Sequence, residues 1–275
     1  MINLAPAIAQ IELLLAQNTD ASLTYAALEC RLAIEGICYE RLRIAHDYIS
    51  HDDLKRWQPR DVVNTLIQEV DSGIAKTFTL SISKEPLQDS STPPTKEEYQ
   101  AIEFLPVGKQ IGFDPNKFGK LWNALAKVAL HITIPVSKDH DVNRYGNKDK
   151  IRAKVVEALE EIKRIGEGTL LSTGVGEEVS FECVCGAKNK RRLELLKDLQ
   201  EISCIRPECS ESFTFTKGDK AFNRRVFDVS CKKCGKHREI PIRTLEKLRV
   251  DQSINFGCGG CGAKIIICWR PAQLQ

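Results

Sequence analysis

Two short stretches in the last third of the chain decide its fold: Cys231-Lys-Lys-Cys234-Gly235 and Cys258-Gly-Gly-Cys261-Gly262. Two residues between the thiols of a tight turn allow both sulfurs to face one metal ion. The glycine after each second cysteine accepts a positive φ and leaves room for backbone N–H groups to bond the sulfurs. The spacing therefore predicts two turns that together hold one tetrahedral metal ion.

An earlier set of cysteines repeats this order of parts. Cys183-Val-Cys185-Gly186 is followed by basic residues, a run of leucines, and then Cys204 and Cys209 with four residues between them. Such an internal repeat predicts the same structure twice. Residues 181–268 resemble a tandem zinc-ribbon module, which implies two structural Zn²⁺ ions, each held by four thiolates. The eight predicted ligands are Cys183, Cys185, Cys204, Cys209, Cys231, Cys234, Cys258 and Cys261.

Paired cysteines can also form disulfides or a redox-active site. Disulfides conflict with the lack of a recognisable secretion signal, and a redox-active pair would stand alone at the start of a helix. Four thiolates leave no open position for water, so both predicted sites are structural. The remaining cysteines, Cys30, Cys38 and Cys268, are expected to be buried free thiols.

Charge divides the chain into two parts. The 275 residues carry a net charge of +3, but residues 181–275 hold 19 Lys and Arg against 11 Asp and Glu. The preceding part is therefore acidic and the cysteine-rich part basic, and two zinc tetrathiolate sites lower the formal +8 of that part to about +4. Since the sequence contains no apolar run long enough to span a bilayer, we expect a cytoplasmic protein without a membrane partner.

The basic residues of the cysteine-rich part form clusters, some of them beside Phe213, Phe215, Phe222 and Phe227. Cations with interleaved aromatic rings suit phosphate contacts and base stacking, so we predict binding to RNA or DNA. In the alternative interpretation the phenylalanines form the ribbon core and the charges solvate its surface. The predicted nucleic-acid contacts are Lys188, Lys190, Arg191, Arg192, Lys217, Lys220, Arg224, Arg225, Lys232, Lys233, Lys236 and Arg238.

The fold class expected for the whole chain is multidomain α plus small β. Helical periodicity and capping residues predict a helical bundle over residues 1–168, with a helix from about residue 20 to 50 and a β insertion at about 77–107. A Gly-rich linker is expected over 169–178, the first ribbon over 179–222 and the second over 223–275.

One early segment, Tyr39-Glu-Arg41-Leu-Arg43-Ile-Ala-His46-Asp47, contains an Arg-x4-His spacing. Within a helical domain it resembles the HEPN superfamily, many of whose members are metal-independent ribonucleases of toxin and phage-defence systems. That resemblance implies a dimer cleft in which Arg41 stabilises phosphate charge and His46 acts as acid and base. The alternative is that Arg41 forms a buried ion pair.

These observations predict a nucleic-acid-binding zinc-ribbon protein of a bacterial defence or regulatory system, whose helical domain dimerises or docks a partner. One alternative is a HEPN-like endoribonuclease with Arg41 and His46 as catalytic residues. A second is a protein–protein adaptor in a larger assembly. The sequence leaves open whether the protein is an enzyme, although binding is favoured.

Overall fold

The computed structural model describes residues 2–50, 54, 58–86, 95–132, 134–135, 137–139, 142–174 and 176–268. The chain separates into two compact units. The first comprises Met1–Ala45 and Arg56–Val175, and the second His46–Lys55 and Gly176–Gln275. Parts of the predicted β insertion (87–94) and of the predicted second ribbon (269–275) lie outside the described residues.

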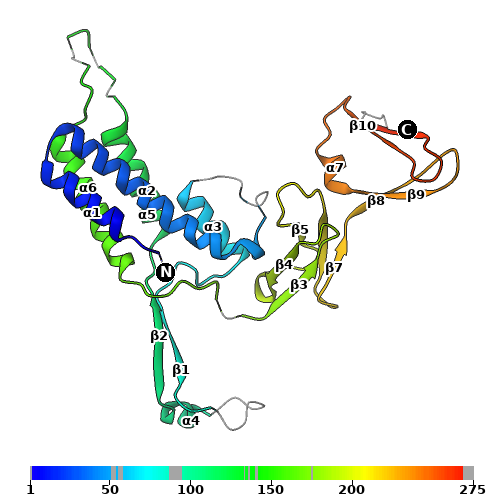
Figure 1. Ribbon diagram of the computed structural model, residues 1–275, viewed down its shortest axis with the longest axis horizontal. Helices are drawn as coiled ribbons and strands as arrows, with labels where there is room; N and C mark the ends of the chain where they lie inside the picture. The colour runs from blue at the N-terminus through cyan, green and yellow to red at the C-terminus, as the bar shows by residue number, and fades with distance from the viewer. Residues whose placement is uncertain are drawn as a thin grey trace. The chain divides into compact units, whose positions relative to one another are not determined.

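The first unit is a helical bundle around one central helix (Figure 1). The central helix α2 packs against α1, α3, α5 and α6, which agrees with the predicted mixture of a helical front and small β elements. In the described part of the chain, none of the helices has the length and apolar character needed to cross a membrane. The helices are α1 (Ala5–Gln17), α2 (Asp20–Ile44), α3 (Pro59–Glu69), α5 (Pro115–Leu125), a π-helical turn η3 (Ala126–Leu130) and α6 (Lys148–Gly166).

Helix α2 begins as its sequence predicts but ends earlier. The Thr19 side chain accepts from the Ser22 backbone N–H at 3.0 Å, and the Ser22 hydroxyl accepts from the Thr19 N–H at 2.9 Å, which forms a capping box. The helix ends at Ile44, not near residue 50, and His46–Tyr48 form a 3-10 turn η1. The predicted helix was too long because Tyr48 continues the apolar periodicity of the residues before it.

The β insertion is an arm that extends from the helices (Figure 1). Strands β1 (Phe78–Ser83) and β2 (Phe104–Gln110) pair antiparallel, with a bulge between Leu80 and Ser81, and the short helix α4 (Lys96–Ala101) precedes β2. Helix α4 lies inside the stretch at about 77–107 that was predicted as a β insertion. The capping box of Thr95 and Glu98 explains why these residues are helical.

The second unit consists of small antiparallel sheets arranged in two successive parts. We call residues 176–225 the first ribbon and residues 226–268 the second ribbon. The first contains β3 (Glu178–Glu182), β4 (Lys188–Arg192), a 3-10 turn η4 (Leu193–Leu195), β5 (Glu201–Ser203), β6 (Ser212–Thr216) and β7 (Ala221–Arg224). The second contains β8 (Val226–Ser230), β9 (His237–Pro241), α7 (Ile242–Glu246), β10 (Ser253–Gly257) and β11 (Lys264–Cys268).

Each ribbon pairs its strands locally. Strand β3 pairs with β4, β5 with β6, β6 with β7, β8 with β9, and β10 with β11. A short helical turn, η4 or α7, stands between the two sheets of each ribbon, so the internal repeat seen in the sequence is also a repeat of structure. Because β7 pairs with β6, the predicted boundary at residues 222 and 223 falls inside a strand of the first ribbon.

A segment from between α2 and α3 also belongs to the second unit. The hydroxyl of Tyr48 donates to the Glu178 carboxylate, and the Arg192 guanidinium lies 5.2 Å from the centre of the Tyr48 ring. Tyr48 is buried by these contacts. The hydrogen bond from Tyr48, followed by the nearby cations, lowers the pKa of the Glu178 carboxyl group. The sequence offered no sign that residues 46–55 fold with the cysteine-rich part.

The ribbons differ in how much apolar surface they bury. In the first, the rings of Phe181, Phe213, Phe215 and Phe222 form a continuous cluster with centroid distances of 4.4–5.1 Å. Among the described residues of the second ribbon, Ile240 is the buried aliphatic side chain and Phe227 is 51% exposed. Three of the four phenylalanines considered for base stacking are therefore core residues.

Arg41 is the largest side chain that the helical unit buries, with 1% of its surface exposed. Its guanidinium donates to the backbone carbonyls of Ile74 at 3.1 Å, Ile111 at 3.3 Å and Ile37 at 3.4 Å. It also stacks 4.6 Å from the centre of the Phe113 ring. Burial lowers its pKa to about 10, so it stays charged at neutral pH. Among the described residues, carbonyl oxygens and not the ion pair that we considered satisfy this charge.

We predict that Arg41→Ala destabilises the helical unit by about 2–4 kcal/mol, because it leaves three carbonyls unpaired and creates a cavity. Arg43→Ala is the matched control, since the side chain of Arg43 is 69% exposed. It should change stability by less than about 0.5 kcal/mol. Urea denaturation of the two variants measures the difference, and equal stabilities would contradict the structural role of Arg41.

Candidate metal centres

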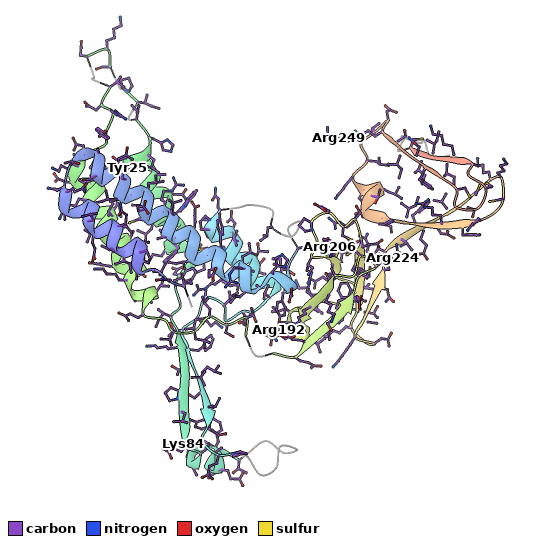
Figure 2. All side chains as sticks on the ribbon, in the orientation of Figure 1. Tyr25, Lys84, Arg192, Arg206, Arg224 and Arg249 are labelled. Carbon is purple, nitrogen blue, oxygen red and sulfur yellow. The ribbon has the colours of Figure 1, made fainter. Side chains whose placement is uncertain are left out.

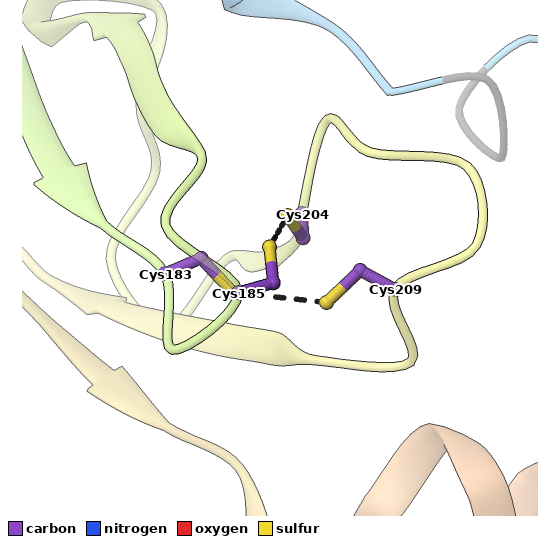
Figure 3. Close-up of side chains that lie close together, drawn as sticks. All are labelled: Cys183, Cys185, Cys204 and Cys209. Atoms are coloured by element: carbon purple, nitrogen blue, oxygen red, sulfur yellow. Dashed lines mark hydrogen bonds between the residues drawn. The ribbon is translucent and has the colours of Figure 1, made fainter.

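Four thiols converge at one point in each ribbon. In the first, the sulfurs of Cys183 and Cys209 lie 3.7 Å apart and those of Cys185 and Cys204 3.6 Å apart (Figure 3). In the second ribbon the corresponding pairs, Cys231 with Cys261 and Cys234 with Cys258, lie 3.8 and 3.6 Å apart. Within each group all four sulfurs lie within 4.8 Å of one another.

These distances fit a metal ion better than any other arrangement of thiols. A regular tetrahedron with Zn–S bonds of about 2.3 Å has S–S edges of about 3.8 Å. The measured separations of 3.6–3.8 Å match those edges. Four soft thiolate donors in this geometry suit Zn²⁺ and close its coordination shell. Both groups can therefore hold a structural metal ion, as the cysteine spacing predicted.

Three of the four cysteine turns close in the same way. Gly186, Gly235 and Gly262 have φ values of +79°, +72° and +69°. Each donates its N–H to the carbonyl of the first cysteine in its turn, at 2.8–2.9 Å. A Cβ added at any of them would meet nothing within 4 Å. Backbone conformation, not lack of space, explains these glycines.

The fourth turn, Cys204 to Cys209, has no such glycine and is held by other contacts. Cys209 donates its N–H to the Arg206 carbonyl at 3.0 Å, and Arg206 donates to the Cys185 carbonyl at 3.0 Å. Asn189 donates its side-chain amide to Cys204 Sγ at 4.0 Å and accepts from the Ile205 N–H at 2.9 Å. Sequence reasoning missed Asn189, which shares the buried face of β4 with Arg191, whereas Lys188 and Lys190 take the alternate positions.

Backbone amides prepare the second centre to bind a cation. The N–H groups of Gly260 and Cys261 lower the pKa of the Cys258 thiol to about 6, and Gly260 donates to its sulfur at 3.4 Å. A Cβ at Gly260 would lie 2.9 Å from Cδ of Lys236, an exposed and flexible side chain that can move aside. The amides thus favour the thiolate form of Cys258, which is the form that binds zinc.

The three remaining cysteines fall into two classes. Cys30 and Cys38 are buried, as predicted, and burial raises the pKa of each thiol to about 12. Cys268 is exposed at the end of β11, and the prediction that it is buried was wrong. Strand β11 has exposed residues in alternation, and Cys268 takes an outward position.

Several of the predicted nucleic-acid contacts are engaged within the protein. Arg192 is 4% exposed and pairs with Glu178 at 3.0 Å, while the buried Arg191 donates to the Lys190 carbonyl at 2.7 Å (Figure 2). Lys220 pairs with Glu177 at 2.7 Å, and Lys190 lies 3.8 Å from Glu178.

Arg224 and Arg225 join the two ribbons. Arg224 forms a two-pronged contact with Glu211 of the first ribbon, at 2.7 Å for both bonds, and reaches Glu239 of the second at 2.6 Å. Arg225 pairs with Glu201 of the first ribbon at 2.7 Å and Glu246 of the second at 3.2 Å. These guanidinium groups therefore stabilise the contact between the ribbons.

The other predicted contacts remain at the surface. Lys188 and Lys217 are exposed on the first ribbon. On the second, Lys232 and Lys233 stand in the turn between Cys231 and Cys234, Lys236 lies just before β9, and Arg238 lies on β9. We call Lys232, Lys233, Lys236 and Arg238 the knuckle face.

The two residues of the HEPN-like motif have different surroundings. Arg41 is buried in the helical unit with its guanidinium on three carbonyls, whereas His46 is exposed at the start of η1 in the second unit. An RNA phosphate could reach the Arg41 guanidinium only if those carbonyl contacts broke. Catalysis by this pair stays a prediction from the motif.

No protein-family model matches the chain, and comparison with the curated proteins and with the solved structures also gave no match. The zinc-ribbon and HEPN resemblances therefore rest on the residues of this chain. Its own geometry supports the first of them through the two cysteine groups.

We predict two zinc ions per chain, one for each group of four sulfurs. Elemental analysis of the purified protein should give about two, and Cys231→Ser should give about one. Cys268→Ser is the control and should retain both ions, because Cys268 is exposed and belongs to neither group. A wild-type content below one would refute the assignment.

Chelation should affect the two ribbons unequally. Because the second ribbon has little apolar core, its folding depends more on metal binding than that of the first. During treatment with a zinc chelator, amide deuterium uptake should rise over residues 226–268 before it rises over residues 196–222. Readdition of zinc should restore protection. Simultaneous loss in both ribbons would contradict the role of the phenylalanine cluster.

Proposed function

We propose that this is a zinc-dependent nucleic-acid-binding protein whose second ribbon contacts phosphates through its knuckle face. The observation that carries the proposal is the grouping of four exposed cations, Lys232, Lys233, Lys236 and Arg238, around one cysteine turn. A metal ion that fixes Cys231 and Cys234 would also fix the backbone that presents these cations.

The charge balance favours the second ribbon over the first. Residues 226–268 carry eight Lys and Arg against four Asp and Glu, whereas residues 176–225 carry ten against nine. Each zinc tetrathiolate contributes a formal −2, so the second ribbon remains positive and the first does not. Phosphate groups are therefore attracted to the second ribbon.

Two contacts hold part of the knuckle face in place. Arg238 donates to the Gly257 carbonyl at 3.1 Å and lies 4.6 Å from the centre of the Phe256 ring. Lys236 donates to the Gly259 carbonyl at 3.4 Å. Both cations therefore span from the β8–β9 hairpin to the β10–β11 hairpin, which orders them without neutralising their charge.

Binding should weaken steeply with salt. Four phosphate contacts predict a slope of about −3 when the logarithm of the binding constant is plotted against that of the salt concentration. Fluorescence anisotropy with labelled single-stranded RNA, single-stranded DNA and duplex DNA measures this slope. Replacement of Lys232, Lys233 and Lys236 together by Gln should reduce the slope by about 2 and weaken binding at least tenfold.

The matched control removes three exposed lysines from the helical unit, Lys120, Lys148 and Lys150, also by replacement with Gln. This variant has the same net charge as the knuckle-face variant and should bind like the wild type. Equal losses in the two variants, or a response independent of salt, would overturn the proposal. A salt-independent response would favour the protein adaptor.

A further inference from the structure

Helix α2 has a second apolar stripe that faces away from the core. Tyr25, Leu28 and Leu32 are spaced by three and four residues and expose 58%, 39% and 50% of their surface. Figure 2 labels Tyr25 on this helix. The core-facing stripe of the same helix includes Leu23, Ile34 and Ile37. A helix with apolar residues on two sides packs on both of them, and no described part of this chain covers the second side.

Gly36 continues the outer stripe one turn beyond Leu32. It is a glycine in the interior of a 25-residue helix, a position where glycine costs about 1 kcal/mol relative to alanine. A Cβ at this position would meet nothing within 4 Å, so packing among the described residues gives no reason for the missing side chain. Close approach of another backbone or side chain from outside is the remaining physical reason.

The surface around Gly36 is hollow. Leu32, Ala33 and Gly36 form one wall of a groove, and Ile2, Leu4 and Ala7 form the other. Glu29 and Glu40 stand at its rim. Glu40 is already paired with Arg43 at 2.7 Å, so it brings no unpaired charge to a partner. The groove accepts one bulky aliphatic side chain beside a closely approaching helix.

We propose that this face is a homodimer interface, in which α2 packs antiparallel against α2 of a second copy. In that arrangement Leu32 of each copy enters the groove at Gly36 of the other. A two-fold axis satisfies both contacts at once, as expected of an isologous interface. The same chain thus supplies both the protruding side chain and the groove that receives it. A different partner would need both a side chain that fits this groove and a groove that accepts Leu32.

Charge supports this orientation. An antiparallel pairing centred between Leu32 and Gly36 brings Tyr25 of one copy opposite Arg43 of the other. The side chain of Arg43 is 69% exposed and can stack on the Tyr25 ring. A parallel pairing would instead place each Arg43 beside the other and leave neither of them opposite a Tyr25 ring.

The oligomeric state of the full zinc-loaded chain tests the proposal. Sedimentation equilibrium should give a dimer for the wild type and a monomer for Leu32→Asp, with a dissociation constant raised about 100-fold or more. Leu13→Asp is the matched control: Leu13 is 55% exposed on α1, about two and a half helical turns beyond the groove residue Leu4 and on the opposite side of the helix, and its variant should remain dimeric.

Gly36→Leu separates dimerisation from folding. Leucine is a better helix former than glycine and has open space here, so the thermal midpoint of the variant should stay equal or rise. The leucine fills the groove, so the dimer should be lost. Tyr25→Lys and Tyr25→Glu test the orientation, because opposite Arg43 only the lysine variant should weaken the dimer, by about fivefold.

A monomeric wild type at micromolar concentration would overturn the proposal, as would a dimer that persists in Leu32→Asp or in Gly36→Leu. Equal effects of Tyr25→Lys and Tyr25→Glu would overturn the antiparallel arrangement. None of these outcomes depends on nucleic acid, so they are independent of the function proposed for the ribbons.

Discussion

Convergence of four thiols on one point is the constraint on which the cysteine-rich part depends. Thiolates whose sulfurs lie 3.6–3.8 Å apart repel one another, and a metal ion between them would balance that charge. The first ribbon adds four phenylalanine rings to this arrangement, whereas the second adds only a few contacts such as that of Arg238 with Phe256. The two copies of the motif thus differ in how much apolar burial accompanies their cysteine group.

The metal ligands could be predicted from the sequence because they depend on local geometry. Cysteine spacing and one glycine with positive φ define a turn regardless of what surrounds it, and the turn at Gly235 forms as its residues indicate. Helices with caps, such as α2 at Thr19, were predictable for the same reason. The end of α2 was not, because contacts of Tyr48 with Glu178 and Arg192, distant in sequence, decide it.

Arginine is the residue that sequence reasoning interpreted least well here. A cluster of cations indicates affinity for phosphate only if the cations reach solvent, and periodicity does not reveal whether a guanidinium meets a carboxylate or a carbonyl. Arg41 satisfies three carbonyls, Arg192 stacks on Tyr48, and Arg224 joins two ribbons through Glu211 and Glu239. A planar guanidinium group with five donors can form several hydrogen bonds and ion pairs within one fold. Arginine in a small domain therefore often stabilises the structure instead of binding a ligand. The exposed lysines of the second ribbon carry the clearer signal.

The inclusion of residues 46–55 in the second unit has a consequence for dissecting this protein. The polypeptide passes between the units three times, near residues 45, 55 and 175, instead of once. A fragment that starts at residue 176 therefore lacks Tyr48 and its contacts with the Glu178 and Arg192 side chains. A protease that cuts only near residue 175 would leave the two pieces tethered by the segment that Tyr48 anchors. In the linear sequence the tandem ribbons look like a separate C-terminal domain. Their unit nevertheless includes residues 46–55, which lie between two segments of the helical unit.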